Sequence, residues 1–388
     1  MKARLGDVCT VVSGSTPKST VPEYWDGDIK WITPAELSND TYIINDSARH
    51  ITALGVAKTG LKSFPAGTVI LSSRAPIGKT AIAGCEMFCN QGFKNLICSE
   101  KIDSKYLYYF LSGKTDYLNS LGRGATFKEI SKAIVENIEI PLPEVEEQKR
   151  IATRFERLLR LIQLQKAELE ELDKLVKSRF IELFGDPVRN SMGLPTEPMT
   201  TVCAIIDGDR GKNYPKQDEF SDAGYCLFLN AKNVTATGFS FENRMFITKE
   251  KDNALHNGKL ERGDVVLTTR GTLGNLAFYD DSVPFENVRI NSGMVILRMK
   301  KSVMTEVFFM EQFKLQLQSI KGKIASGSAQ PQLPISTMNK IRILLAPMAL
   351  QEQFAAFVEQ TDKSKLAVQK GLQELEILKK SLMQQYFG

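Results

Sequence analysis

The spacing of apolar residues changes character along the chain, and the changes divide it into four segments. Residues 1–143 alternate short β-like runs with turn residues, and residues 187–346 repeat this plan. Residues 144–186 and 347–388 are rich in charge and carry apolar residues at helical intervals. The pattern predicts two β-rich modules, each followed by one long helix.

The first predicted helix has an apolar seam with heptad spacing that is interrupted only at Gln165. The seam consists of Ile151, Phe155, Leu158, Ile162, Leu169, Leu172 and Val176. About 40 helical residues at about 1.5 Å each would span about 60 Å, which is too long to be buried in one module. The helix therefore needs a partner.

The second long segment supplies that partner with Phe354, Val358, Val368, Leu372, Leu375 and Leu382. Lys365 and Lys379 replace apolar residues of the first seam, and Gly371 costs a helix interior about 1 kcal/mol. We expect the two helices to pair antiparallel and to give the chain a pseudo-two-fold axis. The predicted class is α+β, with two similar mixed α/β domains joined by the helix pair.

Within the first module, apolar runs at 69–73 and 80–83 predict strands that flank a loop at 74–78. Residues 105–111 predict a helix ending at Gly113, and residues 121–126 predict a flexible loop. Pro141 and Pro143 close the module because proline continues neither a strand nor a helix there.

The two halves of the chain repeat each other in several stretches. Residues 66–78 return at 262–274 with an offset of 196, and residues 8–14 return at 202–208 with an offset of 194. Asn90-Gln-Gly92 returns as Asn291-Ser-Gly293, and the ends of both helices also match. Each half is therefore one module and one helix, and two diverged copies suggest recognition of two different things at a fixed separation.

Composition sets only broad bounds. The 388 residues are 43% hydrophobic and 24% charged, which is average for a soluble globular protein, and the net charge of +5 is mildly basic. The first seven residues lack the apolar core of a signal peptide, and no apolar run is long enough to span a membrane. The six cysteines form no Cys-x-x-Cys pair, so we expect reduced thiols, no metal site and a cytoplasmic location.

Three motifs imitate catalytic or nucleotide sites, but the second copy argues against each. Residues 73–80 resemble a phosphate-binding loop, yet their counterparts 269–276 lack its lysine and hydroxyl. Glu23 with Asp28 and Lys30 resembles a nuclease centre, yet Tyr225 and Leu227 replace the last two. The pair Gly122 and Gly124 follows no clear strand. We expect a non-catalytic binding protein without a cofactor; an enzyme with a hidden nuclease or ATPase centre, and a coiled-coil scaffold without a DNA role, remain as alternatives.

Arg74 and Arg270 occupy the most similar loop of the two copies. Each could form a surface salt bridge, or could bind a phosphate or a guanine through two parallel hydrogen bonds. The loops at 123–128 and 326–332 occupy equivalent places but differ in residue type. Tyr24, Trp25 and Trp31 could stack on bases, although their alternating pattern is more typical of a core. Our candidate DNA-binding residues are Lys18, Arg74, Lys79, Arg123, Thr126, Lys128, Arg210, Lys212, Asn213, Arg270, Asn275, Lys323, Ser326, Ser328 and Gln330.

Over its whole length the chain resembles the specificity subunit of Type I restriction-modification systems. The matching stretches are 13–25, 31–34, 72–78, 90–94, 138–148 and, most strongly, Lys177-Ser-Arg-Phe-Ile-Glu-Leu-Phe-Gly-Asp186. The second half keeps Thr269-Arg270 with Gly274, and Gln351-Glu-Gln353, but differs at 209–215.

The resemblance implies two target-recognition domains, each of which recognises one half of a bipartite site in double-stranded DNA. It also implies that the helices fix the gap and dock two methyltransferase (modification) subunits, that a restriction subunit can join, and that ATP and the methyl donor belong to these partners. Two unlike copies on one chain would recognise an asymmetric site, whereas identical copies would recognise a palindrome.

Overall fold

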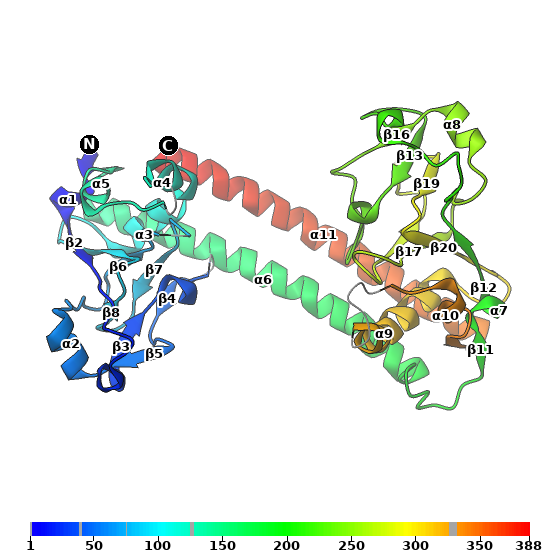
Figure 1. The fold of residues 1–388 in the computed structure, drawn as a ribbon, viewed down its shortest axis with the longest axis horizontal. Helices are drawn as coiled ribbons and strands as arrows, with labels where there is room; N and C mark the ends of the chain where they lie inside the picture. Colours follow the sequence, from blue (N-terminus) through cyan, green and yellow to red (C-terminus); the bar gives the residue numbers. More distant parts are fainter. Residues whose placement is uncertain (1, 39–40, 75, 125–127, 326–331) are drawn as a thin grey trace. The chain divides into compact units, whose positions relative to one another are not determined.

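The computed structural model describes residues 2–38, 41–74, 76–124, 128–325 and 332–388, with the backbone alone for 323–325. The chain forms two compact units, which are residues 1–167 with 369–388 (unit 1) and residues 168–368 (unit 2). The long helices α6 (Val145–Phe184) and α11 (Met348–Phe387) each contribute one part to each unit (Figure 1). The two long helices predicted from the apolar spacing are confirmed.

Unit 1 contains a five-stranded sheet in the order β2-β9-β6-β7-β4, a three-stranded sheet β5-β3-β8, and the pair β1-β10. The strands are β1 (Lys2–Arg4), β2 (Cys9–Ser13), β3 (Trp25–Ile32), β4 (Ile43–Ile44), β5 (Arg49–Ile51), β6 (Val69–Leu71), β7 (Thr80–Ala83), β8 (Phe88–Cys89), β9 (Lys94–Cys98) and β10 (Glu139–Pro141). The shorter helices are α1 (Leu5–Val8), α2 (Ala53–Thr59), α3 (Ser104–Ser112), α4 (Thr115–Leu121) and α5 (Lys132–Glu136), with 3-10 turns at Pro22–Tyr24 and Pro34–Glu36.

Unit 2 contains a four-stranded sheet in the order β12-β20-β17-β18, a three-stranded sheet β16-β13-β19, and the pairs β11-β21 and β14-β15. The strands are β11 (Thr196–Pro198), β12 (Cys203–Asp207), β13 (Cys226–Leu229), β14 (Val234–Thr235), β15 (Gly238–Phe239), β16 (Phe246–Ile247), β17 (Asp264–Thr268), β18 (Leu276–Tyr279), β19 (Val288–Ile290), β20 (Met294–Met299) and β21 (Arg342–Leu344). The shorter helices are α7 (Met199–Val202), α8 (Lys249–Ala254), α9 (Glu306–Ala325) and α10 (Ile335–Met338), with 3-10 turns at Gln217–Glu219 and Ala231–Asn233.

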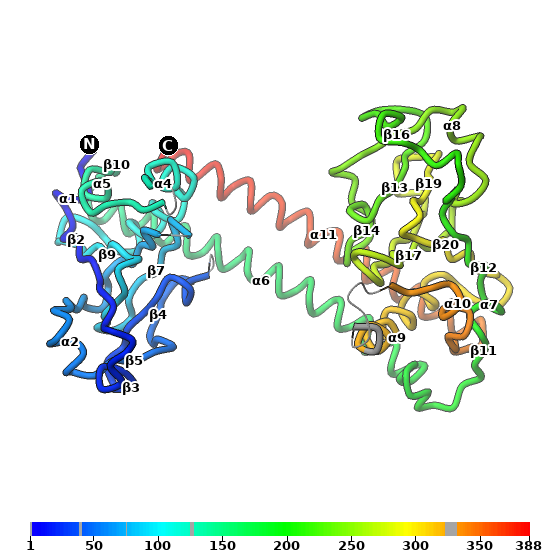
Figure 2. The backbone as a smooth tube through the Cα atoms, in the orientation of Figure 1, coloured from blue at the N-terminus to red at the C-terminus, as the bar shows by residue number. Residues whose placement is uncertain are grey.

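The two units share one topology, as the internal repeat predicts. The order β2-β9-β6-β7 of unit 1 matches β12-β20-β17-β18 of unit 2. In both three-stranded sheets the central strand pairs parallel on one side (β3 with β8, β13 with β19) and antiparallel on the other (β3 with β5, β13 with β16). Figure 2 lets the reader follow the backbone through β2, β3 and β9, and through their counterparts β12, β13 and β20.

In unit 1 the beginning of α6 packs antiparallel against the end of α11. Phe155 stacks on Tyr109 of α3 and on Phe387, with ring centroids 5.1 Å and 5.8 Å apart. Farther along, Lys166 of α6 lies 3.8 Å from Glu376 of α11. These contacts bury the first seam residues in the core of unit 1.

In unit 2 the end of α6 packs antiparallel against the beginning of α11. Phe180 contacts Phe354, with ring centroids 5.5 Å apart, and Lys365 lies 2.7 Å from Asp173. Lys365 therefore replaces an apolar seam residue with an ion pair. Both halves of the seam are thus covered by helix partners within their own unit.

The sheets form the remaining core. Val69, Ile70 and Leu71 of β6 are fully buried, which agrees with a strand covered on both faces. Trp25 and Trp31 are also buried and meet edge to face with centroids 5.1 Å apart. The interpretation of these two tryptophans as core residues is confirmed.

Candidate nucleic-acid interface

Arg74 lies on a tight turn between β6 and β7 that is formed by the repeated motif. The Ser72 hydroxyl donates to the Pro76 carbonyl at 2.7 Å and accepts from the Lys79 amide at 2.9 Å. Gly78 has a φ of +93°, which favours glycine, and its amide donates to the Ser72 carbonyl at 3.0 Å. The hydroxyl and the glycine therefore fix the backbone that carries Arg74.

Unit 2 forms the same turn around Arg270, between β17 and β18. The Thr268 hydroxyl donates to the Thr272 carbonyl at 2.5 Å and accepts from the Asn275 amide at 2.9 Å. Gly274 has a φ of +80°, and its amide donates to the Thr268 carbonyl at 2.8 Å. A hydroxyl residue and a glycine at these spacings therefore form the turn that carries the arginine in both units.

The other two repeated stretches of unit 1 pack against this turn. Asn90 accepts from the Gly92 amide at 2.9 Å, and the Gly92 carbonyl accepts from the Ser73 amide at 2.7 Å. Gly14 lies against the backbone of Cys89 and Asn90, so that a Cβ atom at position 14 would be 2.1 Å from the Cys89 carbonyl oxygen. The three repeated motifs therefore meet beside Arg74.

Unit 2 reproduces this convergence beside Arg270. Asn291 accepts from the Gly293 amide at 2.9 Å, and the Gly293 carbonyl accepts from the Thr269 amide at 2.9 Å. A Cβ atom at Gly208 would lie 2.2 Å from the Asn291 carbonyl oxygen. The stretches that are most alike in the two halves are thus the ones that build the arginine turn.

In unit 1 the arginine is held by an acid that the sequence analysis did not identify. Nε and Nη2 of Arg74 both lie 2.8 Å from Oε2 of Glu129. The other oxygen of Glu129 lies 3.2 Å from Nζ of Lys94, which in turn is 3.3 Å from the Ser73 hydroxyl. Burial alone would raise the pKa of Glu129, but hydrogen bonds from Arg74 and Lys94 outweigh it and hold this pKa below its usual range.

Lys94 is the member of this cluster that the sequence could have revealed. It begins strand β9, and its side chain is only 8% exposed. A lysine is rarely so buried unless it is paired. Its place at the start of a strand that continues into Leu96, Ile97 and Cys98 was the available signal.

The equivalent positions in unit 2 lack both partners. The Ile130 amide donates to the Ser73 carbonyl, and the Leu333 amide donates to the equivalent Thr269 carbonyl. Glu129 precedes Ile130 and Gln332 precedes Leu333, so Gln332 takes the place of Glu129. Ser13 and Asp207 are the last residues of the equivalent strands β2 and β12. Ser13 pairs with Lys94 and Asp207 pairs with Val295, so Val295 takes the place of Lys94.

Arg270 consequently has different surroundings. It lines a pocket of about 310 Å³ together with Arg210, Asp207 and Gln332. Within the described residues, Arg210 forms an ion pair with Asp207 at 3.0 Å in this pocket, whereas Arg270 forms no ion pair. Arg74 is therefore clamped by a carboxylate, whereas Arg270 has no such clamp among the described residues.

The remaining candidates of unit 1 separate into surface and internal residues. The backbone of Arg123 pairs with Glu129, which brings Arg123 and its exposed neighbour Lys128 beside Arg74. Lys18 is exposed, and its carbonyl accepts from the Trp25 indole at 3.2 Å. The Lys79 ammonium instead donates to the Leu37 carbonyl, so its charge is engaged inside the unit. Thr126 lies outside the described residues.

In unit 2, Arg210 lies close to Arg270 and Lys212 is exposed, whereas two amide side chains are used internally. Asn213 donates to the Ala254 carbonyl and Asn275 donates to the Val234 carbonyl, both at 2.9 Å. The side chain of Lys323, and Ser326, Ser328 and Gln330, lie outside the described residues.

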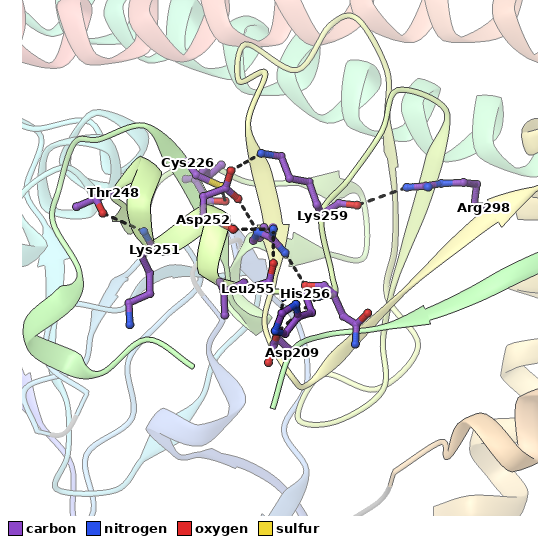
Figure 3. Close-up of polar contacts among 12 residues, drawn as sticks. Asp209, Cys226, Thr248, Lys251, Asp252, Leu255, His256, Lys259 and Arg298 are labelled. Atoms are coloured by element: carbon purple, nitrogen blue, oxygen red, sulfur yellow. Dashed lines mark hydrogen bonds and ion pairs between the residues drawn. The ribbon is translucent and has the colours of Figure 1, made fainter. Parts of the chain in front are cut away.

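A buried ionic centre supports the loop that carries Arg210 and Lys212. Asp252 and Arg289 are 1% and 5% exposed, with Oδ1 and Nε 2.5 Å apart. Lys259 donates to the second oxygen of Asp252 (Figure 3). Arg289 also donates to the Asn257 carbonyl at 2.7 Å. The centre therefore ties α8 and the segment after it to β19.

Asp209 connects that segment to the loop. Its carboxylate accepts from the Gly211 amide at 2.9 Å and from the His256 amide at 2.8 Å (Figure 3). These backbone hydrogen bonds, with Gly211 the strongest cause, hold the pKa of Asp209 below its usual range. A negative charge at position 209 thus fixes the backbone on which Arg210 lies.

The motifs that imitate catalytic sites are occupied by structural contacts. Besides Lys79, the Lys30 ammonium of the nuclease-like group donates to the Asn45 carbonyl at 2.6 Å. Among the described residues, no group of three or more histidine, cysteine or acidic side chains is placed to hold a metal ion. None of the described helices has the length and apolar character needed to cross a membrane.

Comparison with known proteins agrees with this geometry. The family model described as "Type I restriction modification DNA specificity domain" matches residues 1–174 and 200–377. The MjaIX Type I restriction enzyme specificity subunit of Methanocaldococcus jannaschii is 30% identical over 409 residues, covering 98% of this chain and 90% of that protein. The MjaVIII specificity subunit of the same organism is 25% identical with the same coverage.

Two solved structures share the fold at low identity. The S subunit of a Type I restriction-modification system from M. genitalium is similar with a TM-score of 0.59 and 17% identity, covering 100% of this chain and 96% of that chain. A chain solved in work on complex assembly and conformational transition of the type I R-M system has a TM-score of 0.64 and 18% identity, covering 100% and 97%. With two copies of the family domain, one in each half, the chain belongs to the family of Type I restriction-modification specificity subunits.

Proposed function

We propose that this chain selects the DNA site of a Type I restriction-modification complex, with each unit recognising one part of a bipartite, asymmetric sequence. The observation that carries the proposal is the convergence of the repeated motifs on Arg74 in one unit and on Arg270 in the other. The scaffolds are alike, while the residues around the arginines differ: Glu129 and Lys94 against Gln332 and Val295. Like scaffolds with unlike contact residues suit two unlike half-sites.

We further propose a division of labour along the chain. Residues 1–143 and 187–346 serve as recognition modules, and residues 144–186 and 347–388 serve as the spacer helices that set the length of the unread gap. The chain is not catalytic in this proposal: methyl transfer and ATP-driven cleavage belong to methyltransferase and restriction subunits in the cytoplasm.

The long helices offer surfaces on which two methyltransferase subunits can dock. In unit 1, Leu161 and Leu164 of α6 are 50% and 54% exposed, and Ile377 of α11 is 67% exposed. In unit 2, Leu175 and Leu366 are 48% and 67% exposed. Apolar side chains on an otherwise charged helix support a helix-to-helix contact with a partner.

Sequencing of methylated bases in cells that express the chain with its methyltransferase subunits tests the proposal. We expect one motif with two different half-sites and a constant gap. Methylation without such a motif would contradict the proposal, as would appreciable nuclease or ATPase turnover by the isolated chain with DNA, ATP and magnesium.

A further inference from the structure

The contrast between the two arginine turns suggests different roles for the same residue. We infer that Arg74 recognises a guanine in the major groove, with Glu129 and Lys94 as the residues that position it. Arg270 contacts a backbone phosphate instead. This inference rests on the proposed DNA-recognition function and assigns the chemistry of its two central contacts.

The geometry of the clamp is the first argument. Glu129 engages Nε and Nη2 of Arg74 through a single oxygen, at 2.8 Å for both atoms. Among the described residues Glu129 is the acceptor for this guanidinium, so Nη1 and the outer proton of Nη2 keep their hydrogen-bonding capacity. Those two donors are parallel, and the O6 and N7 acceptors of guanine match them.

Charge is the second argument. The Glu129 side chain is 32% exposed beside Arg74, so its negative charge weakens the attraction of Arg74 for a phosphate. A base edge carries no net charge and depends less on that attraction. Lys94 is buried and balances Glu129 from the inside, so the carboxylate stays ionised and stays in place.

The fixed orientation is the third argument. The Lys94 ammonium is held by Glu129 at 3.2 Å and by the Ser73 hydroxyl at 3.3 Å, and Ser73 precedes Arg74. The backbone of Arg74 also pairs with that of Glu129. An arginine that is fixed before binding loses less side-chain entropy when it forms two directional bonds.

Unit 2 supplies the opposite case. Among the described residues Arg270 has no carboxylate clamp, and it lines a pocket of about 310 Å³ together with Arg210. Arg210 is itself paired with Asp207, so the uncompensated charge of the pocket is that of Arg270. An arginine that no carboxylate orients suits an anionic group whose attraction depends on charge more than on orientation. The two units therefore use one scaffold for two kinds of contact.

The internal repeat provides the matched variant. Lys94→Val combined with Glu129→Gln gives unit 1 the residues that unit 2 carries at these positions, and it leaves no buried charge unpaired. Circular dichroism melting of this variant and of Arg74→Lys checks that both remain folded. Arg270→Gln is the comparison in the other unit.

The first readout is the methylated motif, mapped for each variant in complex with the methyltransferase subunits. We expect the double variant and Arg74→Lys to relax one guanine position in one half-site by about tenfold, and to leave the other half-site unchanged. We expect Arg270→Gln to relax no position, to weaken binding to matched and mismatched duplexes alike, and to lower the slope of log affinity against log salt by about one.

The second readout is binding to a duplex of the mapped site in which that guanine is replaced by 7-deazaguanine, which lacks the N7 acceptor. The wild-type complex should lose about tenfold in affinity, whereas the Arg74→Lys complex should lose little further. Unchanged guanine preference in the folded double variant, or a relaxed base position in Arg270→Gln, would overturn the inference. A wild-type complex without any bipartite motif would instead defeat the proposed function, and the inference with it.

Discussion

The Asp252 carboxylate and the Arg289 guanidinium form a buried ion pair, with Oδ1 and Nε 2.5 Å apart, at a place where unit 1 is apolar. Thr248 is the N-cap of α8 and Thr52 is the N-cap of α2, and Asp252 and Val56 each lie four residues after their cap, so they are counterparts. Arg289 pairs with Phe228 and Phe88 pairs with Trp31, each at the next-to-last residue of the central strand, so Phe88 is the counterpart of Arg289. One fold thus fills the same position with an ion pair in one unit and with apolar side chains in the other.

Loss of this pair should destabilise unit 2 selectively. Asp252→Asn leaves Arg289 buried without its counter-charge, which costs about 3–5 kcal/mol. Both tryptophans of the chain, Trp25 and Trp31, lie in unit 1, so urea unfolding followed by tryptophan fluorescence should change little while limited proteolysis of unit 2 accelerates. Glu219→Gln, which removes a more exposed pair with Lys251, is the control and should cost less than about 1 kcal/mol.

The same pair predicts how the stability of unit 2 depends on pH. Burial alone would raise the pKa of Asp252, but hydrogen bonds and charge from Lys259 and Arg289 outweigh it and lower the pKa. A carboxyl with a lower pKa in the folded state stabilises above its unfolded value of about 3.9 and loses that contribution as the pH falls below it. Urea unfolding of unit 2 between about pH 6 and pH 3 should therefore show a steeper loss in the wild type than in Asp252→Asn. Equal slopes would argue against the ion pair.

The interruption of the helix seam at Gln165 should be a weak point of unit 1. Its buried Oε1 atom has no hydrogen-bond partner among the described residues, and a Cβ atom at Gly371 would lie 2.8 Å from its Nε2 atom. Gln165→Leu restores the apolar seam, so it should raise the free energy of unfolding by about 1–2 kcal/mol, measured by tryptophan fluorescence in urea. Gln163→Leu, on the exposed side of the helix, should change it by less than about 0.5 kcal/mol. A destabilised Gln165→Leu variant would show that Gln165 has a structural role.

The exposed leucines of α6 should affect assembly without affecting the fold. Leu161→Ser with Leu164→Ser should leave the melting temperature nearly unchanged, because both side chains are about half exposed. Co-purification with the methyltransferase subunits should fall by at least about tenfold if these residues form part of the docking surface. Leu54→Ser, at a leucine of α2 that is 47% exposed, is the matched control and should leave co-purification intact.

Features repeated within the chain were predictable from the sequence, and features formed by one copy alone were not. The repeat located Arg74 and Arg270, and the apolar spacing predicted α6 and α11. The partner of Arg74 was missed because Glu129 is 55 residues away and has no acidic counterpart at Gln332. Such pairs depend on tertiary contacts, which periodicity does not encode.

The internal hydrogen bond of the Lys79 side chain was not predicted for a related reason. Its ammonium donates to the carbonyl of Leu37, 42 residues earlier, and a turn lysine carries no local sign of such a partner. The ion pair of Asp252 with Arg289 joins residues 37 apart and replaces apolar residues of unit 1. Comparing the two copies therefore gave no signal for it.

Exchange of one module tests the central claim most directly. Residues 1–143 can be replaced by the corresponding segment of the MjaIX specificity subunit, and the methylated bases can be mapped in complex with the methyltransferase subunits. Two independent recognition units on one chain predict that one half-site changes while the other half-site stays the same. A motif that changes in both halves, or in neither, would contradict this account.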